Sequence, residues 1–462
     1  MQERGALHER HFVVWGLGKQ GLAAATYLVR QGAAVSVVER RTQEQAQAAV
    51  AELSPWAERV RYFWEGELPN RWEGVDSVIL SPGVPFDLPE LVQLREQGVR
   101  TVAALDVAVQ CTDIPIVAVT GSAGKSTTVS LIGSILNASG LPSFVGGNLG
   151  TPLFVWLNEE SSAERLVLEC SSFQLEATTH LRPKVAVLTN LGENHLDRHK
   201  TMDSYADCKA NMFRYMDKDA WVVARAGDPW NDKVLGDTHA QICYFHPEGE
   251  AEVGAMSIGD QLVLRHPIWG EDSIPWSALR LRGGHNRENA MAAALAARLA
   301  GASAESISQG FQHFAGLQHR LEDVGVVGGV HFFNDSKATT PAAAVRSIQA
   351  FGDDDTLHVL LGGRSKGNRF VEINEALQTG KKRLYLFGES AATIADDLES
   401  DVQMSLFPSM KDACVAAQNA ASSGDVILLS PACASFDEFA NFEERGRWFR
   451  DWVLRLGEEV HV

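Results

Sequence analysis

The sequence lacks the features of a membrane or secreted protein. No run of 18 consecutive apolar residues occurs in it, and its first ten residues, MQERGALHER, are charged rather than apolar. A membrane-spanning helix needs about 20 apolar residues, and a secretory signal peptide needs an apolar stretch behind its basic start. We therefore expect a cytoplasmic protein with no membrane partner.

The sequence also contains few cysteines and fewer basic than acidic residues. The 462 residues include six cysteines, none of them in a CxxC pair. We therefore expect neither a disulfide framework nor a zinc site built on paired cysteines. Lysine and arginine number 41 against 59 aspartates and glutamates, which gives a formal charge of −18. Because binding to nucleic acid needs a broad basic face, we expect no nucleic-acid partner, and acidic substrates must meet locally placed cations.

The composition that remains is that of a soluble α/β protein. Hydrophobic residues make up 45% of the chain, charged residues make up 22%, and 40 residues are glycine. These values are typical of globular proteins and exclude disordered and fibrous classes. Since one domain usually holds about 100 to 200 residues, a chain of this length should form two or three of them.

A glycine-rich loop follows the first predicted strand. Residues 12–15 read as a buried strand, and Gly16, Gly18 and Gly21 have GxGxxG spacing before an Ala-rich helix. A second predicted strand ends at Glu39. Such glycines let the backbone close on a phosphate at a helix N-terminus, and an acid after the second strand can bind a hydroxyl pair. The pattern usually indicates a dinucleotide, but another nucleotide or a structural turn stays open.

A second loop, GSAGKST, lies between the predicted strand PIVAVT and a helix. Its backbone N–H groups would surround a phosphate, Lys125 would reach toward a γ-phosphate, and Ser126 or Thr127 would offer a hydroxyl to Mg²⁺. Position 119, where the GxxxxGK[ST] motif has its first glycine, is a valine. Strand, loop and helix still agree, so the sequence favours triphosphate binding over a structural loop.

Two further strand ends carry groups that could hold a metal ion. Glu169 follows the apolar run RLVL, and His195 follows KVAVL after a short loop. Because the carboxyl ends of parallel strands share one edge of a sheet, we expect both near the GKST loop, with a divalent cation between them. Each alone is more often an ordinary polar residue at a strand end.

Three polar residues are ambiguous from the sequence alone. Lys209 lies on a predicted helix four residues after Tyr205, and this spacing favours a solvated lysine. Asn286 and Asn289 precede a strongly Ala-rich helix. They could face a nucleotide base or cap that helix.

A third block of strands and helices begins near Leu317. Its predicted strands GVHFFND, TLHVLLGG, RLYLFG and DVILLS alternate with helical stretches, which indicates a further α/β sheet. Polar clusters follow three of them, at 335–339, 364–366 and 430–435. Cations and hydroxyls at strand ends suit an acidic small molecule.

Segments spread over the whole chain, in the right order, resemble the Mur ligases of peptidoglycan synthesis. They are TGSAGKST, LECSSFQLE, NLGENHLDRH, GGHNRENAMAA, LQHRLE, NDSKATT, LLGG and LLSPACASFDEFANFEERG. NDSKAT, SPACAS and the trailing FxxRG are similar to the members that add glutamate. Such a series is far more specific than either glycine loop.

The resemblance implies three α/β domains. These are a Rossmann-like N-terminal UDP-binding domain at 1–104, a central P-loop ATPase domain at 105–316, and a C-terminal Rossmann-like glutamate-binding domain at 317–462. The implied activity is ATP-dependent ligation of glutamate to UDP-N-acetylmuramoyl-L-alanine through an acyl phosphate, with Mg²⁺, by a monomer. We expect the third domain to close onto the second during the reaction.

The resemblance also assigns residues to each ligand. The UDP-substrate is assigned Gly18, Lys19, Gln20, Glu39, Arg40, Gly83, Asn148, Ser171 and Gln174. ATP is assigned Gly121, Gly124, Lys125, Ser126, Thr127, Asn286, Asn289, Arg320 and Asp335. Glutamate is assigned Lys337, Thr339, Lys366, Ser435 and Phe442. The catalytic residues would be Lys125, His195 and Lys209, and the metal ligands Ser126, Glu169, His195 and a carbamylated Lys209.

Carbamylation gives Lys209 a role that its spacing does not suggest. An ammonium beside Mg²⁺ would be repelled, whereas reaction with CO₂ converts the amine into a carboxylate-like ligand. Lys209 matches the family lysine that is modified in this way.

Three alternatives stay open. The residues around the glutamate do not distinguish the D from the L form. GxGxxG with Glu39 also fits an NAD-dependent dehydrogenase, and a non-enzymatic sensor of UDP-sugars fits the two loops. Protection by UDP without hydride chemistry would exclude the dehydrogenase. Phosphate release that depends on both acceptor and glutamate would exclude the sensor.

Overall fold

The computed structural model describes residues 7–68, 72, 74–148, 150–159, 161–367, 369–398 and 402–459. They form two compact units. One holds the residues up to Leu279 together with Glu288–His313, and the other holds Arg280–Arg287 together with the residues from Phe314 onward. Within the described ranges no helix is both long and apolar enough to cross a membrane. All six cysteines carry free thiols, as predicted.

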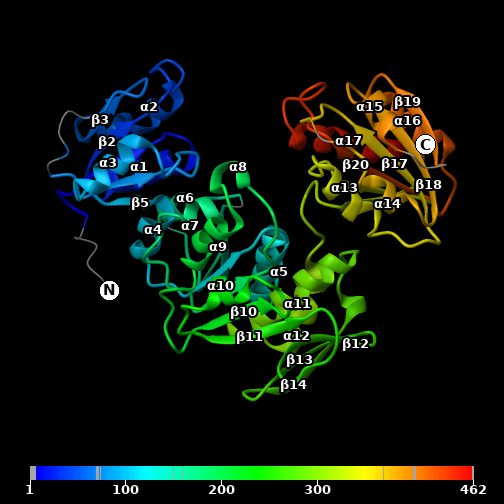
Figure 1. The fold of residues 1–462 in the computed structure, drawn as a ribbon, viewed down its shortest axis with the longest axis horizontal. Coiled ribbons are helices and arrows are strands. Elements are labelled where there is room, and N and C mark those ends of the chain that lie inside the picture. The colour runs from blue at the N-terminus through cyan, green and yellow to red at the C-terminus, as the bar shows by residue number, and fades with distance from the viewer. Residues whose placement is uncertain are drawn as a thin grey trace. The chain divides into compact units, whose positions relative to one another are not determined.

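The first sheet of the first unit has five parallel strands in the order β3-β2-β1-β4-β5. They are β1 (His11–Trp15), β2 (Ala34–Val38), β3 (Val60–Phe63), β4 (Ser77–Leu80) and β5 (Thr101–Ala103), with α1 (Lys19–Arg30), α2 (Gln47–Leu53), α3 (Pro89–Glu96) and α4 (Ala104–Ala108), drawn in blue shades in Figure 1. The strand order reverses between β1 and β4, and such sheets bind ligands beyond the strand ends at this point. The glycine loop and Ser81–Gly83 follow these two strands.

The second sheet of this unit has nine strands in the order β14-β13-β12-β11-β10-β9-β6-β8-β7. They are β6 (Ile116–Thr120), β7 (Ser143–Gly147), β8 (Arg165–Glu169), β9 (Val185–Leu188), β10 (Trp221–Arg225), β11 (Gln241–His246), β12 (Gly254–Ile258), β13 (Gln261–His266) and β14 (Gly270–Pro275). The last three pair antiparallel, and the others run parallel. The antiparallel part was not predicted.

Short and long helices connect these strands. They are α5 (Lys125–Ala138), α6 (Leu153–Asn158), α7 (Ser172–Leu175), α8 (Leu196–His199), α9 (Met202–Ala210), α10 (Asn231–Leu235), α11 (Gly284–Leu299) and α12 (Ala304–His313). α5 follows β6, α7 follows β8, and α8 follows β9. The loops that begin these helices therefore lie at the carboxyl ends of three neighbouring strands.

The second unit contains a six-stranded sheet in the order β15-β16-β20-β17-β18-β19. Its elements are β15 (Glu322–Val327), β16 (Val330–Asn334), β17 (Thr356–Gly362), β18 (Lys381–Phe387), β19 (Gln403–Phe407) and β20 (Val426–Ala432), with α13 (Pro341–Ile348), α14 (Ile373–Leu377), α15 (Ala391–Asp397), α16 (Met410–Ala420) and α17 (Phe442–Glu459). β15 is antiparallel and the remaining strands are parallel. The four predicted strands are β16, β17, β18 and β20, whereas β15 and β19 at the edges were not predicted.

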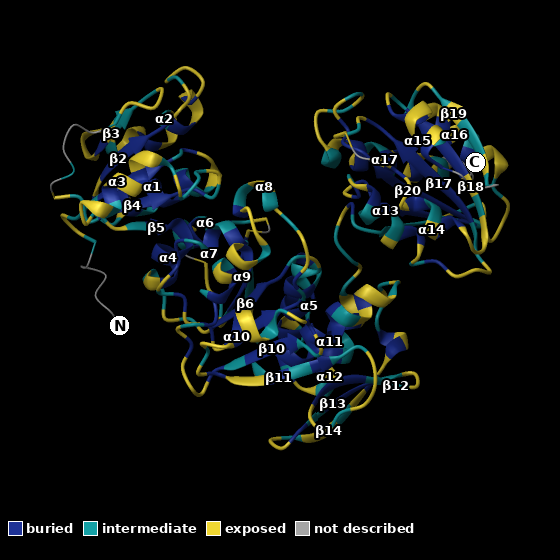
Figure 2. Cartoon of the chain, viewed as in Figure 1, coloured by how far each residue is buried: buried dark blue, intermediate teal, exposed yellow. Residues whose placement is uncertain are grey.

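The central strands form the cores. β4, β6, β8 and β9 are buried along nearly their whole length. In the second unit β17 and β20 are dark blue in Figure 2 because almost every residue on them is buried. Strands covered by helices on both faces read as continuous apolar runs rather than alternating ones. The α/β class with mostly parallel sheets, predicted from these runs, is confirmed.

Candidate active site

The GKST loop joins β6 to the N-terminus of α5. Gly124 has a φ of +82°, and a Cβ at this position would lie 2.1 Å from Oδ1 of Asn289. Only glycine fits there, and the side chain of Asn289 packs directly against the loop. Nζ of Lys125 donates to the carbonyl oxygens of Gly121 at 2.8 Å and Ser122 at 3.0 Å. A cation and the amino end of a 14-residue helix therefore face the same loop, an arrangement that favours a phosphate.

Glu169 is the last residue of β8 and lies beside this loop. Its side chain is buried, and Oε2 accepts a hydrogen bond of 2.6 Å from Oγ of Ser126. Oε1 accepts one of 2.8 Å from Nδ2 of Asn148. The sheet thus gathers three residues that the sequence assigned to ATP, to the metal and to the UDP-substrate.

The donor atoms at Glu169 suit Mg²⁺, which prefers oxygen ligands and keeps several waters. No three His, Cys, Asp or Glu side chains of the described residues gather to hold a metal ion. A cation bound to Ser126 and Glu169 would therefore take its other ligands from phosphate, from water, from a single imidazole or from a modified side chain.

Lys209 lies on α9 beneath the loop and is only 1% exposed. Its Nζ donates to Oγ1 of Thr120 at 3.2 Å and to the carbonyl oxygen of Gly121 at 2.9 Å, and it lies 4.6 Å from the centre of the Tyr205 ring. Burial first, and the charge of Lys125 second, lower the pKa of Lys209 well below its usual 10.5. The solvated lysine that its spacing favours is wrong, and the low pKa populates the neutral, nucleophilic amine.

His195 caps the start of α8 with a left-handed backbone, at a φ of +55°. A non-glycine residue in this region is strained and persists only where its surroundings hold it. The centre of the His195 ring lies 4.9 Å from the centre of the Phe173 ring on α7. Partial burial of the ring, followed by the charge of Lys125, lowers the pKa of His195. The imidazole is therefore neutral at neutral pH and has a lone pair to offer.

The residues assigned to the UDP group surround the reversal point of the first sheet. Gly18, Lys19, Arg40 and Gly83 are exposed there. Nζ of Lys19 donates to the carbonyl oxygen of Gly150 at 2.9 Å. These backbone and cationic groups are accessible to an anionic ligand.

Glu39 differs from these residues because it is buried. Its Oε2 accepts hydrogen bonds from the backbone N of Leu17 at 2.7 Å and from Nη2 of Arg41 at 3.0 Å. Burial raises the pKa of Glu39, but the bonds from Arg41 and Leu17 outweigh it and leave the pKa below its usual value. In this structure the carboxylate holds the glycine loop in place. The same loop packs tightly, since a Cβ on Gly21 would lie 1.9 Å from the carbonyl oxygen of Gly16.

Ser171 and Gln174 begin α7 and bind each other. The Ser171 hydroxyl accepts from the backbone N of Gln174, and the Gln174 side chain accepts from the backbone N of Ser171, which makes a capping box. Gln174 also lines a small cavity together with Gln20 and Gly147. The cavity is therefore lined by residues that follow strands of both sheets.

In the second unit, the residues assigned to glutamate lie after β16, β17 and β20. Nζ of Lys337 lies 5.1 Å from the centre of the Phe442 ring, and Oγ of Ser336 donates to the carbonyl oxygen of Phe442 at 2.8 Å. Lys366 is exposed on the loop after β17, and Ser435 is buried after β20. Since β20 lies between β16 and β17, these loops share one edge of the sheet.

Arg445 is a central residue of this cluster that was not assigned a role from the sequence. It is 1% exposed and donates to Oγ of Ser336 at 2.9 Å and to the carbonyl oxygens of Ser336 at 2.8 Å and Cys433 at 3.1 Å. Burial lowers its pKa to about 10, so it stays charged at neutral pH. The guanidinium ties α17 to the loops after β16 and β20. The FxxRG segment contains this arginine and was the signal that could have marked it.

Asp335 anchors the loop that carries Arg320. Its buried carboxylate accepts from the Ser347 hydroxyl, from the backbone N of Leu321 at 3.0 Å and from Oγ of Ser430 at 3.4 Å. Burial raises its pKa to about 6, against these hydrogen bonds. Asn286 lies in the same unit, where its Nδ2 donates to the carbonyl oxygen of Arg282 at 2.7 Å.

Comparison with known proteins gives matches along nearly the whole chain. Family models match at 10–103 (Mur ligase MurD-like, N-terminal domain), 119–297 (Mur ligase middle domain) and 319–433 (Mur ligase, glutamate ligase domain). A UDP-N-acetylmuramoylalanine–D-glutamate ligase of Koribacter versatilis is 34% identical over 97% of this chain and 98% of its own length. The enzyme of the same name from Acidobacterium capsulatum is 37% identical over 97% of each chain.

Among solved structures, the MurF ligase of Thermotoga maritima in complex with ADP has a similar fold. Its TM-score is 0.59 at 18% identity, over 98% of this chain and 97% of that one. The three matched domain models and the identity to curated relatives along nearly the whole chain lead to one conclusion: this chain belongs to the Mur ligase family.

Proposed function

We propose that the protein joins glutamate to UDP-N-acetylmuramoyl-L-alanine at the expense of ATP, in the synthesis of peptidoglycan precursors. One observation carries the proposal: Lys125, Ser126 and Glu169, whose side chains suit a phosphate and a cation, lie together at the ends of adjacent strands. They do so in a chain that is 34% and 37% identical over nearly its full length to ligases of that name.

The chemistry follows from what an amide bond needs. A carboxylate is a poor acyl donor, so the terminal carboxylate of the alanyl group attacks the γ-phosphorus of ATP, ADP leaves, and an acyl phosphate forms. The free amine of glutamate then attacks the acyl carbon, loses a proton, and expels inorganic phosphate as the amide forms. The protein contributes position and charge, with Lys125 and the amino end of α5 facing the transferred phosphate.

Ser126 and Glu169 would hold Mg²⁺, and His195 and Lys209 are the further ligands that we propose. The bound cation would neutralise the charge on the phosphate oxygens during transfer. The neutral state of His195 fits this role, since an imidazolium has no lone pair to offer.

We also propose that Lys209 carries a carbamate in the active enzyme. The neutral amine attacks the carbon of CO₂ and loses a proton, which leaves an N-carboxylate. Its deep burial and lowered pKa support this step, because both favour the neutral amine. The carbamate would then place a negatively charged oxygen ligand near Glu169.

Glutamate would bind to the cluster after β16, β17 and β20. Lys337 and Lys366 offer charges to its carboxylates, Thr339 and Ser435 offer hydroxyls, and Phe442 closes one side. The names of the relatives favour D-glutamate, with L-glutamate as the alternative. The ATP side would be completed by Thr127, Asn286, Asn289, Arg320 and Asp335.

The cellular setting is part of the same proposal. We place the protein in the cytoplasm as a monomer without membrane or nucleic-acid partners. Its formal charge of −18 supports the last of these, because a nucleic acid would be repelled.

The decisive experiment is a coupled assay of phosphate release that offers D-glutamate and L-glutamate separately, each with and without UDP-N-acetylmuramoyl-L-alanine. We expect release only when ATP, the acceptor and D-glutamate are all present. Release with L-glutamate alone would favour the alternative amino acid. Release that ignores both acceptor and glutamate would overturn the ligase function.

A further inference from the structure

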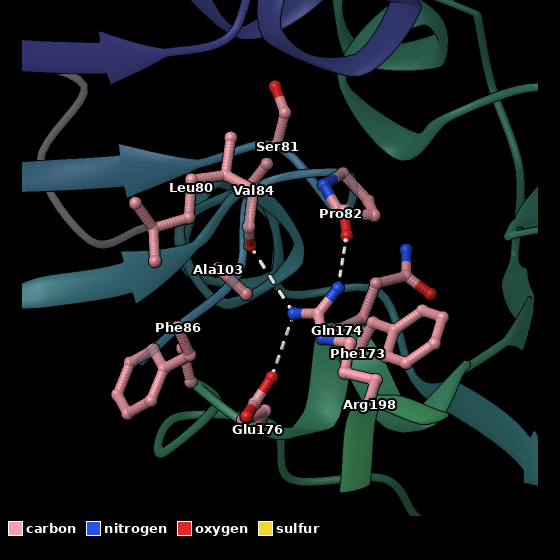
Figure 3. Close-up of a pocket in the computed structure, with 12 residues that line it drawn as sticks. Leu80, Ser81, Pro82, Val84, Phe86, Ala103, Phe173, Gln174, Glu176 and Arg198 are labelled. Carbon is pink, nitrogen blue, oxygen red and sulfur yellow. Dashed lines mark hydrogen bonds and ion pairs between the residues drawn. The ribbon is translucent and has the colours of Figure 1, made fainter. Parts of the chain in front are cut away.

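Arg198 joins two parts of the first unit that the proposed reaction uses for different ligands. It lies on α8, three residues after His195, and its guanidinium reaches the loop after β4. Nη1 donates to the carbonyl oxygen of Pro82 at 3.1 Å, and Nη2 donates to that of Val84 at 3.3 Å (Figure 3). Gly83, assigned to the UDP group, stands between these two carbonyls.

The same guanidinium is also fixed from α7 and the residue that follows it. Nη2 donates to Oε2 of Glu176 at 2.9 Å, and Cζ lies 4.2 Å from the centre of the Phe173 ring. Figure 3 shows Arg198 between the Pro82 loop and Glu176, with the Phe173 ring beside it. Phe173 in turn contacts His195, with 4.9 Å between ring centres. The Phe173 ring thus contacts both Arg198 and His195.

The region around Arg198 is closely packed and is not a ligand pocket. The cavity lined by Leu80, Ser81, Pro82, Val84, Phe173, Glu176 and Arg198 has a volume of about 10 Å³, room for about one water molecule. The side chains of Arg198 and Glu176 are 19% and 20% exposed. Charge-assisted hydrogen bonds are strong where water is largely excluded, so the position of the Pro82 loop and that of α8 are mechanically linked.

A second arginine, Arg30, also connects the two sheets of the first unit, but it does so away from the loop at Pro82–Val84. Nη1 of Arg30 on α1 donates to the carbonyl oxygen of Asn158, the last residue of α6, at 2.5 Å, and it is exposed. Arg30 therefore contributes to holding the sheets together, but it has none of the contacts that link Arg198 to Phe173. It offers a matched control.

We infer that Arg198 is a positioning residue that couples occupancy of the UDP site to the placement of His195. The inference rests on the proposed function and deepens it. A ligand that contacts Gly83 fixes the carbonyls of Pro82 and Val84, and through Arg198 it fixes α8 with the strained backbone of His195 at its start. Because such coupling is reciprocal, a filled UDP site strengthens binding of ATP with Mg²⁺, and the reverse.

The test measures this coupling by calorimetry without turnover. The affinity for a non-hydrolysable ATP analogue with Mg²⁺ is measured with and without UDP-N-acetylmuramoyl-L-alanine, for the wild type, Arg198→Gln, Arg198→Lys, Glu176→Gln and Arg30→Gln. In the wild type we expect the acceptor to raise the affinity about tenfold. In Arg198→Gln this factor should fall close to one, while the affinity for the acceptor alone changes less than about threefold.

The other variants separate coupling from plain stability. Arg198→Lys keeps the charge but cannot span both carbonyls and Glu176, so it should restore the coupling only in part. Glu176→Gln leaves both carbonyl bonds, and Arg30→Gln weakens the boundary elsewhere, so both should retain the coupling. Thermal unfolding of each variant shows that the compared proteins are folded.

Steady-state kinetics give a second readout. In Arg198→Gln we expect kcat to fall about tenfold while KM for glutamate is unchanged. A wild type without coupling, an Arg198→Gln variant with unchanged coupling and kcat, or an Arg30→Gln variant that loses as much would each overturn the inference. Failure of the ligase function itself would be visible separately, as a wild type without phosphate release that depends on the acceptor.

Discussion

Ser126 and Glu169 come from different elements, the first turn of α5 and the last residue of β8, and they meet in a hydrogen bond of 2.6 Å. Asn148 binds the other oxygen of the same carboxylate at 2.8 Å. Glu169 therefore links the GKST loop to Asn148, which the sequence assigned to the UDP-substrate. A bound cation would interact with the negative charge of the Glu169 carboxylate.

Replacing Glu169 by glutamine tests this use. Glu169→Gln keeps an acceptor for Ser126 but removes the negative charge, so binding of Mg²⁺ should weaken. We expect the Mg²⁺ concentration for half-maximal phosphate release to rise by about tenfold or more. Glu164→Gln is the control, because Glu164 is an exposed carboxylate just before the opposite end of the same strand. An unchanged Mg²⁺ requirement in Glu169→Gln would remove this residue from the proposed metal site.

Replacing Lys209 by alanine tests the carbamate. Lys209→Ala should lose at least about a hundredfold in turnover, because a charged ligand of the proposed cation is gone. Short-chain carboxylates such as acetate should restore part of the rate by entering the space left behind. Lys233→Ala is the control. Lys233 on α10 forms an ion pair at 2.9 Å with Asp207, which lies on the same helix as Lys209, but Lys233 itself lies outside the site. A Lys209→Ala protein with a normal rate would contradict the carbamate.

Replacing Arg445 by lysine tests the glutamate cluster. A single ammonium cannot replace the three hydrogen bonds of the guanidinium to Ser336 and Cys433. Loss of one such charged bond, worth about 1.5 to 3 kcal/mol, should raise KM for glutamate about tenfold or more while the affinity for ATP is kept. Arg447→Lys, an exposed position on the same helix, should leave KM unchanged. Equal effects in both variants would argue against a role of Arg445 in this cluster.

Asp335 predicts how stability depends on pH. Burial raises its pKa from 3.8 to about 6, so the folded protein holds this proton more tightly than the unfolded chain. The contribution of Asp335 to the free energy of unfolding should therefore be largest below about pH 4. It should fall by roughly 3 kcal/mol as the pH rises through 6. Above about pH 7, where the carboxylate is ionised in both states, the contribution is constant.

Thermal unfolding at several pH values checks this sign. Asp335→Asn removes the titrating group and should flatten the fall between about pH 4 and 6. Asp354→Asn changes an exposed carboxylate of the same unit and should keep the slope of the wild type. Identical slopes in the wild type and Asp335→Asn would contradict the raised pKa.

The sequence by itself determined the class of the fold and the strand ends that polar residues follow. Apolar runs such as IVAVT and VILLS are buried strands because a parallel sheet covered on both faces needs continuous apolar residues. Lys125 and Glu169 lie at the carboxyl ends of the neighbouring strands β6 and β8 because these two strands run parallel. The edge strands β15 and β19 were not predicted, because they are half exposed and their apolar residues are interrupted.

Only the tertiary structure decided which polar residues are buried and what they bind. Spacing on α9 favoured a solvated Lys209, but packing under the GKST loop buries it and lowers its pKa. The sequence indicated that Glu39 could bind a hydroxyl pair, and only the fold shows that its Oε2 also accepts hydrogen bonds from Leu17 and Arg41. Arg198 carries no local signal of its contacts, since its partners Pro82 and Val84 lie far away in the sequence. Burial and pairing depend on residues that only folding brings together, and no short sequence pattern contains them.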